Sequence, residues 1–327
     1  MSKEVVSKSP IDRLNYTGDL TPVISRAAQA YRLGEARSFS VIPVGYEDCN
    51  VVINTPTGEY VAKIFTKDRH PEELVRYCTI MEQVIAGGVN HPPLLHTQDN
   101  QIVYSDAETL PMVVMPFIRG NNFLELDHAP TSTERRAILE QAAMINTIPY
   151  HPTFLHDSWA IPNIYQIYAK VSPFVPTEEL ELIQKAIIQY QTIPVSSLPH
   201  ALVHGDFTKA NVLKGDVGKI YVLDFSVANW YPRIQELAVI AANLLYDREN
   251  PQPLKQTCEL VAEEYSQFNP LTDTERQYLY AYALTGVAMT LMGAHQEKYI
   301  KGNDSKETDY WLDLGRNGLR RELHYKL

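Results

Sequence analysis

Cysteine is scarce in this sequence, and long apolar runs are missing from it. The three cysteines, Cys49, Cys78 and Cys258, are odd in number, widely spaced and free of any CxxC pair, so the sequence predicts neither a disulfide framework nor a zinc site. Residues 1–25 hold no apolar signal-peptide segment, and no later stretch is a run of about 18 apolar residues. We therefore expect a protein of the reducing cytoplasm, neither secreted by that route nor membrane-spanning.

Positive charge is also in short supply. Lys and Arg number 29 against 39 Asp and Glu, which gives a formal net charge of −10. Because no run of Lys or Arg forms a patch for nucleic acid or for an anionic membrane, we expect neither as a partner. An acidic surface favours a cationic substrate through long-range steering, although solubility alone also accounts for such a charge.

The length and the residue pattern of the chain predict two lobes. A chain of 327 residues exceeds the usual size of a single core. Short β-branched and aromatic runs predict antiparallel strands between residues 38 and 65 and again at 101–106 and 111–117. Helical spacing of apolar residues predicts helices at about 21–33, 71–86, 132–147, 178–191, 233–246, 254–267, 273–292 and 306–324. The predicted fold is α+β and bilobal, with a small antiparallel β-sheet lobe at 1–115 and a larger, mostly helical lobe at 116–327.

A β-like island interrupts the helices of the second lobe. Its segments VHGD, NVL and IYVLDF are predicted to pair with one another, with a turn at 215–218. The island holds His204 and Asp206 followed by Asn211, in the spacing H-x-D-x₄-N, and a hydrophobic strand then leads to Asp224. The same spacing marks the catalytic loop of protein kinases. A His in this position orders the loop by hydrogen bonding more often than it takes part in chemistry.

Phosphoryl transfer explains why these residue types stand together. Negative charge spreads over the phosphoryl oxygens, so the protein must hold a divalent metal, and Mg²⁺ prefers oxygen ligands such as those of Asn211 and Asp224. A carboxylate off the metal must orient the attacking hydroxyl and take its proton, which is the role we assign to Asp206. Each residue also has a structural interpretation, as a turn cap, a backbone partner or a strand end. The shared spacing favours the catalytic interpretation.

The order of VHGDFTKANVL, YVLDFSVAN and RIQELAVIA resembles the aminoglycoside phosphotransferase, choline kinase and homoserine kinase group of small-molecule kinases. The stretch VIPVGYEDCNVVINTPTGEYVAKIF is similar to the phosphate-covering hairpin and lysine strand of that group. The resemblance spans roughly residues 25–245. It implies a protein-kinase-like fold, ATP and Mg²⁺ as cofactors, and a small-molecule hydroxyl acceptor.

The same resemblance implies the nucleotide contacts. Lys63 would contact the α- and β-phosphates, Gly45 would stand in the covering loop, and Met115–Phe117 would form the hinge that faces the adenine. The family also expects a carboxylate on the next helix to pair with the lysine. Glu73 is favoured over Glu82 because it lies one helical turn before the expected position and on the same face.

The acceptor is expected to meet the loop after the metal aspartate and the C-terminal helices. Aromatic and acidic side chains there suit an ammonium group through cation–π attraction, although aromatic residues also simply pack helices together. The C-terminal pattern is most similar to the homoserine-kinase branch of the group. The candidate residues are Trp230, Tyr231, Tyr282, Glu297, Tyr299, Tyr310 and Trp311.

The sequence thus predicts an ATP-dependent phosphotransferase that acts on a hydroxyl of a small cationic or zwitterionic molecule. Amino acids and amino alcohols lead the candidates, and amino sugars follow. One alternative is a non-catalytic nucleotide-binding regulator, for which the presence of all three motif residues is unfavourable. The other is an atypical protein kinase, which the missing G-x-G-x-x-G loop and the short segment after Asp224 disfavour.

Overall fold

The computed structural model describes residues 10–43, 45, 48–105 and 110–324. The chain divides into two compact units. The first, here called the sheet unit, lies within Val6–Ile85 and His91–Arg119. The second, the helical unit, comprises Ala86–Asn90 and the chain from Gly120 onward. The assignment of 1–115 and 116–327 to separate functional lobes stays a prediction.

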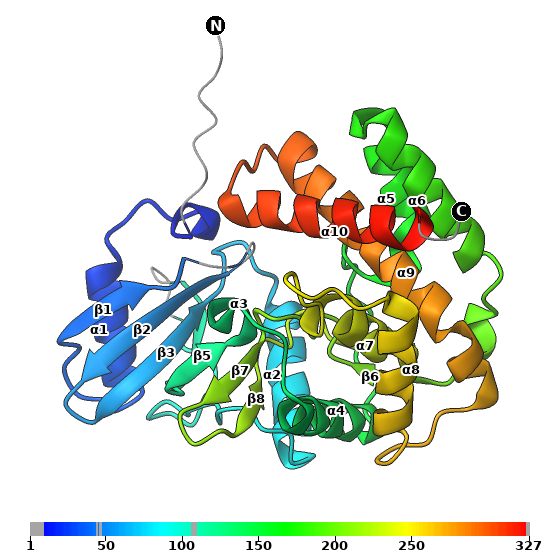
Figure 1. Cartoon of the computed structure of the whole chain (residues 1–327). Helices are drawn as coiled ribbons and strands as arrows, with labels where there is room; N and C mark the ends of the chain where they lie inside the picture. The colour runs from blue at the N-terminus through cyan, green and yellow to red at the C-terminus, as the bar shows by residue number, and fades with distance from the viewer. Residues whose placement is uncertain (1–9, 44, 46–47, 106–109, 325–327) are drawn as a thin grey trace, which may run out of the picture. The chain divides into compact units, whose positions relative to one another are not determined.

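The sheet unit is built on four antiparallel strands in the order β1-β2-β3-β4, of which Figure 1 labels β1, β2 and β3. The three strands predicted between residues 38 and 65 are confirmed, and β4 confirms the strand predicted at 111–117. The prediction of a strand at 101–106 was wrong for the described residues, where a single bridge joins Tyr104 to Met112. The strands are β1 Ser38–Val41, β2 Cys49–Thr55, β3 Gly58–Ile64 and β4 Met112–Pro116.

One helix packs its apolar side against this sheet. α1 (Leu20–Ala30) begins after Asp19, whose carboxylate accepts a hydrogen bond from the backbone N–H of Thr21 at 2.8 Å. Its buried residues join the inward-facing residues of the strands in one core, for example Val51 and Ile64. The unit also contains the 3₁₀ turn η1 (Asp12–Leu14) and most of α2 (Pro71–Ala86), which has the predicted bounds.

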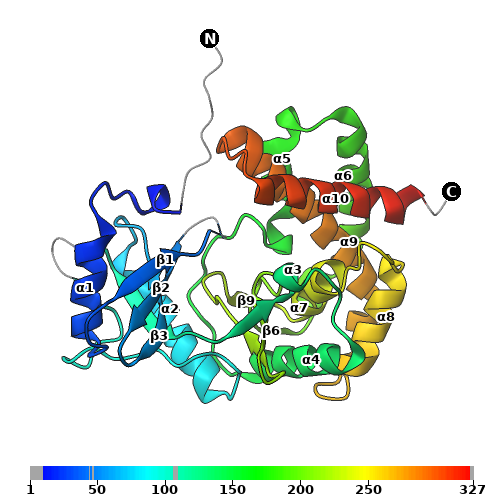
Figure 2. The same cartoon turned by 60° about the vertical axis from the view of Figure 1, so that its left-hand side comes forward.

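Helices form most of the second unit, as predicted, and Figures 1 and 2 both show α5, α6, α9 and α10 grouped together. A short helix, α5, and the one-turn α3 were not predicted. The helix predicted at 233–246 is divided, because its second half winds as the π-helical segment η5. The helices are α3 Phe123–Leu126, α4 Ser132–Thr147, α5 Ile164–Val171, α6 Thr177–Tyr190, α7 Ile234–Val239, α8 Leu254–Tyr265, α9 Asp273–His295 and α10 Lys306–His324. The 3₁₀ and π segments are η2 Ile161–Asn163, η3 Ser172–Phe174, η4 Val195–Ser197, η5 Ile240–Leu244 and η6 Gln296–Ile300.

Two small sheets carry the β-like island. The pairing of NVL with IYVLDF is confirmed, since β7 (Val212–Gly215) pairs with β8 (Ile220–Val222), and β5 (Gly120–Asn122) adds a third strand. The predicted pairing of VHGD with these strands was wrong. β6 (His200–Val203) pairs instead with β9 (Asn229–Pro232), because the loop that follows β6 carries the chain into the other sheet. Within the described residues, no helix has the length and apolar character needed to cross a membrane.

The two longest helices, α9 and α10, approach closely at glycines. A Cβ on Gly315 would lie 2.6 Å from the backbone nitrogen of Leu291, and one on Gly318 would lie 2.7 Å from Cγ1 of Val287. Such contacts are shorter than any real Cβ forms, so only glycine permits this approach at these positions. The packing fixes the direction of α10, whose first turn contains Glu307, a charged neighbour of Asp206.

Replacing Gly315 by alanine should therefore lower the free energy of unfolding by about 1–3 kcal/mol, the usual cost of overpacking. Gly286→Ala, on the same helix pair, is the control, because its Cβ would meet only the end of the Ile161 side chain at 3.2 Å. Urea denaturation of both variants measures the difference. A midpoint for Gly315→Ala equal to that of the wild type would show that the helices separate without cost.

Candidate active site

The loop between β6 and β7 holds Asp206 and Asn211 in direct contact. Nδ2 of Asn211 donates hydrogen bonds to Oδ2 of Asp206 at 2.6 Å and to its backbone oxygen at 3.0 Å. The pKa of Asp206 is raised to about 6, chiefly by burial and then by the charge of Asp224, while hydrogen bonds from Asn211 and Thr208 oppose the shift. Two residues that the sequence predicted to act together are therefore hydrogen-bonded to one another, and Asp224 lies close enough to raise the pKa of Asp206.

His204 supports this loop from within the core, where it is completely buried. Its Nε2 lies 2.9 Å from the backbone oxygen of Leu223, and its Nδ1 lies 3.1 Å from the backbone nitrogen of Asp206. The carbonyl needs a donor and the N–H needs an acceptor, so the ring is neutral with its proton on Nε2. Burial lowers the pKa of His204 to about 4, which agrees with this assignment. The ring thus joins the catalytic loop to the strand that leads to Asp224.

Glu236 of α7 is a second buried support for the loop, and the sequence reasoning missed it. Its carboxyl oxygens accept hydrogen bonds from the backbone N–H groups of His204 and Gly205, the latter at 3.3 Å. Burial raises the pKa of Glu236 to about 8 in spite of these bonds. Every residue of Ile234–Ala238 is buried, and a carboxyl in a helix without an exposed face must bind buried donors. The sequence RIQELA alone does not show this burial.

Asp224 occupies a strained turn directly after β8. Its φ of 65° lies in the left-handed region, which is uncommon for residues other than glycine and is found at functional sites. Its Oδ1 accepts hydrogen bonds from Oγ of Ser226 at 2.6 Å and from the backbone nitrogen of Ser226 at 3.2 Å. Ser226, which was not predicted, therefore fixes the orientation of the carboxylate.

The donor set of this region fits a hard divalent cation. Asn211 offers an amide oxygen and Asp224 a carboxylate, which are the ligand types that Mg²⁺ prefers. Among the described residues, no group of three or more His, Cys, Asp and Glu side chains could hold a metal by itself. The metal-binding role of the two residues stays a prediction.

Lys209 stands in the same loop and is buried, with 6% of its surface exposed. Its backbone nitrogen donates to Oδ1 of Asn243 in η5, and its backbone oxygen accepts from Leu124 of α3, both at 3.2 Å. Burial lowers the pKa of its ammonium group, while the charges of Asp127 and Asp247 raise it. The sequence reasoning assigned no role to this residue.

The predicted nucleotide residues lie in the sheet unit. Lys63 of β3 is 3% exposed and forms an ion pair with Asp48 at 3.2 Å, and Arg69 binds the same carboxylate at 2.6 Å. Glu73 of α2 accepts from Arg69 at 3.2 Å and so joins the cluster through the arginine. The sequence reasoning missed Asp48, whose chain position beside β2 gave no sign of the pairing. The proposed pairing of Lys63 with Glu73 stays a prediction.

The other predicted nucleotide contacts also stay predictions. Gly45 has a φ of 109°, a value that glycine adopts readily and other residues rarely do. Met115 lies within β4 and is buried, and the half-buried Phe117 directly follows that strand. The backbone N–H of Phe117 donates to the carbonyl of Glu59 at 3.0 Å, which ties the predicted hinge to the neighbouring strand.

The predicted acceptor residues are distributed over several elements of the helical unit. Trp230 of β9 is half-buried, with its ring 4.9 Å from that of His151, and Tyr231 is buried. Tyr310 and Trp311 of α10 contact one another edge to face at 4.9 Å. Glu297 of η6 is 3% exposed and forms an ion pair with Lys301 at 2.6 Å.

Electrostatic neighbours connect the first turn of α10 with the catalytic loop. Glu307 raises the pKa of Asp206, after the larger effects of burial and of Asp224. The pKa of Tyr310 is raised by burial and then by the charge of Asp127 at the end of α3. Tyr310 and Lys209 thus share Asp127 as a charged neighbour. Glu307 was not predicted.

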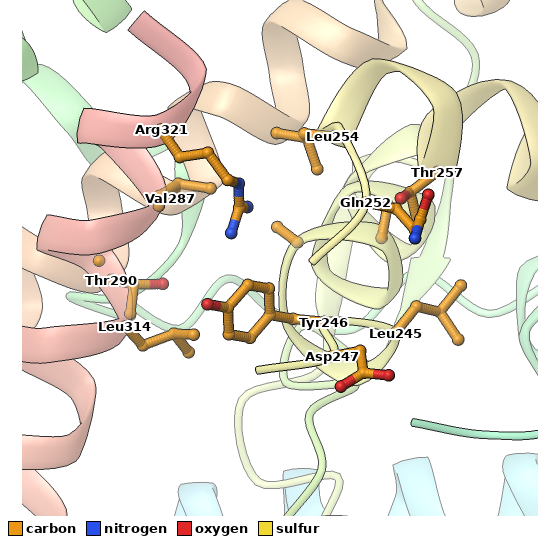
Figure 3. Close-up of a pocket in the computed structure, with 14 residues that line it drawn as sticks. Leu245, Tyr246, Asp247, Gln252, Leu254, Thr257, Val287, Thr290, Leu314 and Arg321 are labelled. Atoms are coloured by element: carbon orange, nitrogen blue, oxygen red, sulfur yellow. The ribbon is translucent and has the colours of Figure 1, made fainter. Parts of the chain in front are cut away.

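A small pocket in the helical unit lies among η5, α8, α9 and α10 (Figure 3). The guanidinium group of Arg321 faces the ring of Tyr246, 4.9 Å from its centroid, and Asp247 lies at the edge. Neither Asp206 nor Asp224 lines this pocket. Asp247, which lines the pocket, is also a charged neighbour of Lys209.

Comparison with known proteins decides the family. Residues 38–271 match the sequence profile of the phosphotransferase enzyme family known as APH. The chain belongs to this family. The match covers β1 of the sheet unit, the catalytic loop, Asp224 and the helical unit as far as the residues after α8. The predictions of the family and of a small-molecule kinase are confirmed.

The curated relatives of this phosphotransferase include homoserine kinases. That of Granulibacter bethesdensis is 23% identical over 270 residues, which cover 81% of this chain and 82% of the relative. That of Zymomonas mobilis is 23% identical over 266 residues, covering 79% and 80% of the two chains.

Solved structures share the fold of the phosphotransferase at low sequence identity. An amicoumacin kinase in complex with AMP-PNP, Ca²⁺ and Ami has a TM-score of 0.69 and 14% identity, over 93% of this chain and 94% of that one. A microcompartment-associated aminopropanol kinase has a TM-score of 0.68 and 14% identity, over 92% and 97% of the two chains. The protein-kinase-like α+β fold predicted from the sequence is confirmed.

The buried carboxyl of Glu236 gives the phosphotransferase a pH-dependent stability. Its pKa is about 8 in the fold against 4.5 ordinarily, so between these values the folded state holds a proton that the unfolded state releases. The free energy of unfolding should therefore fall as the pH rises through this range. Glu236→Gln removes the proton release, so its stability relative to the wild type should increase between pH 5.5 and pH 9, by an amount on the order of a few kcal/mol.

Urea denaturation at the two pH values measures this change. The exposed Glu249→Gln is the matched control, and it should track the wild type at both. A Glu236→Gln variant that is less stable than the wild type by the same amount at pH 5.5 and at pH 9 would show that the carboxyl is already ionised at the lower pH.

Proposed function

We propose that this phosphotransferase is an ATP-dependent kinase that phosphorylates a hydroxyl of a small cationic or zwitterionic molecule. The acceptor classes are amino acids, amino alcohols and amino sugars. The likeness to proteins named homoserine kinases over about four-fifths of both chains puts a hydroxy amino acid first. The formal net charge of −10 supports a cationic or zwitterionic acceptor through steering.

The observation that carries this proposal is the contact between Asp206 and Asn211 at 2.6 Å. Asn211 holds the carboxyl in one orientation, as a group that receives a proton from a positioned hydroxyl requires. A pKa of about 6, raised by burial, brings Asp206 near to neutral pH, where a general base is most effective. Asp206 thus orients the acceptor hydroxyl and takes its proton during attack.

Asn211 and Asp224 are the residues proposed to hold Mg²⁺. The ion, when bound, neutralises the negative charge that develops on the phosphoryl oxygens. Ser226 holds Asp224 in the orientation for this role, and His204 fixes the strand end from which Asp224 projects. Lys63, Gly45, Glu73 and Met115–Phe117 are proposed to contact ATP, and the adenosine-phosphate analogue in the amicoumacin kinase structure supports ATP as the donor.

ATP consumption against a panel of L-homoserine, other hydroxy amino acids, amino alcohols and aminoglycosides tests the proposal. We expect turnover with a hydroxy amino acid or its amino alcohol, and ³¹P NMR should show a phosphomonoester on the acceptor. Transfer to a protein with no transfer to any member of the panel would establish the protein-kinase alternative. ATP binding without transfer to any acceptor would establish the non-catalytic alternative.

Asp206→Asn should lower turnover by about 10²–10⁴, the range for loss of a positioned general base. ATP affinity should change little, because the residue is assigned to the acceptor hydroxyl. Steady-state kinetics and ATP titration measure the two quantities, and Asp216→Asn, in the exposed turn between β7 and β8, is the matched control. Unchanged turnover would remove Asp206 from the mechanism.

Asp224→Ala should abolish the Mg²⁺-dependent part of ATP binding, because its carboxylate is the proposed protein anchor of the ion. Calorimetric titration of ATP with and without Mg²⁺ measures this part. Asp216→Ala controls for the loss of a surface carboxylate. Equal Mg²⁺ dependence in Asp224→Ala and in the wild type would sink the metal assignment.

A further inference from the structure

A buried lysine without a described partner stands inside the catalytic loop. Lys209 is 6% exposed, and lysine is almost never buried unless its charge is paired. None of the described residues forms a hydrogen bond or ion pair with its Nζ, although its backbone is bonded on both sides. The fold thus holds the backbone of Lys209 in place, and none of the described side chains takes up the hydrogen bonds that its ammonium group can donate.

Lys209 lies close enough to Asp206, the proposed base, for one small molecule to contact both residues. It is three residues from Asp206, so the two Cα atoms are at most about 11 Å apart. The backbone bond to Asn243 of η5 and the bond from Leu124 of α3 hold the residue between two elements. An acceptor whose hydroxyl lies at Asp206 could therefore reach Lys209 with an anionic group.

The charges around Lys209 favour a carboxylate over a triphosphate. Asp127 and Asp247 stabilise its ammonium group electrostatically, and neither forms an ion pair with it. The same two carboxylates repel anions, and they repel a triphosphate, with its several charges, more strongly than a single carboxylate. Glu307 is a charged neighbour of Asp206, and Asp127 is a charged neighbour of Tyr310. These two carboxylates supply the negative charge that an acceptor ammonium requires.

We propose that Lys209 binds the carboxylate of the acceptor and so selects a hydroxy amino acid over the corresponding amino alcohol. This inference rests on the proposed function and names the substrate class of the same site. Lys209 is a specificity-determining residue that contacts the acceptor, and Asp206 keeps the role of base. The carboxylate forms a charge-assisted hydrogen bond with Nζ in a buried setting.

Two pairs of acceptors that differ by one carboxylate provide the test: L-homoserine with 3-aminopropan-1-ol, and L-threonine with 1-aminopropan-2-ol. For the wild type, the KM of the carboxylated member of the productive pair should be about 10- to 100-fold lower, as expected for a hydrogen bond to a charged group. Lys209→Met should raise that KM to near the KM of the amino alcohol. It should leave the KM of the amino alcohol and of ATP within about threefold.

Matched variants keep the result interpretable. Lys209→Arg retains the charge and should retain most of the preference, which separates the charge from the packing of the side chain. Lys219→Met, an exposed lysine in the turn between β7 and β8, should behave as the wild type. Thermal melting of each variant shows whether it folds. If Lys209→Met does not fold, two other measurements decide between the outcomes: the acceptor preference of Lys209→Arg, and the direct binding of the two acceptors to the wild type.

The inference is overturned if Lys209→Met keeps the wild-type preference for the carboxylated acceptor. It is also overturned if Lys209→Met lowers turnover of both the amino acid and the amino alcohol and raises the KM of ATP, since the lysine would then act on phosphoryl oxygens. A wild type that uses both members equally also overturns it, while the proposed function stands. A wild type that phosphorylates only aminoglycosides, or nothing in the panel, refutes the hydroxy amino acid as acceptor and this inference with it.

Discussion

Glu236 and His204 lie beneath the catalytic loop, and the loop takes its shape from the backbone groups that they bind. The carboxyl of Glu236 accepts the N–H groups of His204 and Gly205, and the imidazole accepts the N–H of Asp206 while it donates to the carbonyl of Leu223. Each of these groups would be costly to bury alone. Together they leave the loop few alternative conformations, and they connect α7, the loop and the end of β8 in one hydrogen-bonded unit.

The hydrogen bonds of Glu236 and His204 allow strained and mutually repelling groups to persist in and beside the loop. Asp224 keeps a left-handed backbone, and its charge raises the pKa of Asp206. A loop without this support would move one carboxylate away and so relieve both the strain and the repulsion. Lys209, whose ammonium group forms no ion pair with any described residue, is held in the same manner, by backbone bonds on both sides. Such arrangements cost stability, and they are typical of sites in which the energy is recovered when a substrate binds.

The sequence predicted those parts of the fold and site that depend on local pattern. Amphipathic spacing sufficed for α2, α4 and α10, and the spacing of Asp206, Asn211 and Asp224 sufficed to predict that they lie together, while their roles stay predictions. The partner of β6 could not be predicted, because strand pairing is decided by tertiary packing and β9 lies beyond Asp224 in the chain. Glu236, Asp48 and Lys209 were missed for a related reason: burial of a charged side chain becomes visible only when the surrounding elements are placed.

The π-helical winding of η5 has a consequence for how this protein can change over evolutionary time. A π turn holds one residue more than an α turn, and it turns the side chain of Asn243 so that it reaches the catalytic loop. Loss of one residue within 240–244 would restore regular α winding, and because the wider turn had absorbed that residue, the side chains before and after the segment would keep nearly their present directions. Glu236 would therefore stay in the core, whereas Asn243, which lies within the segment, would lose the position from which it binds the backbone of Lys209. Single-residue deletions in this segment are thus expected to loosen the loop of Lys209 while the rest of the helix keeps its packing.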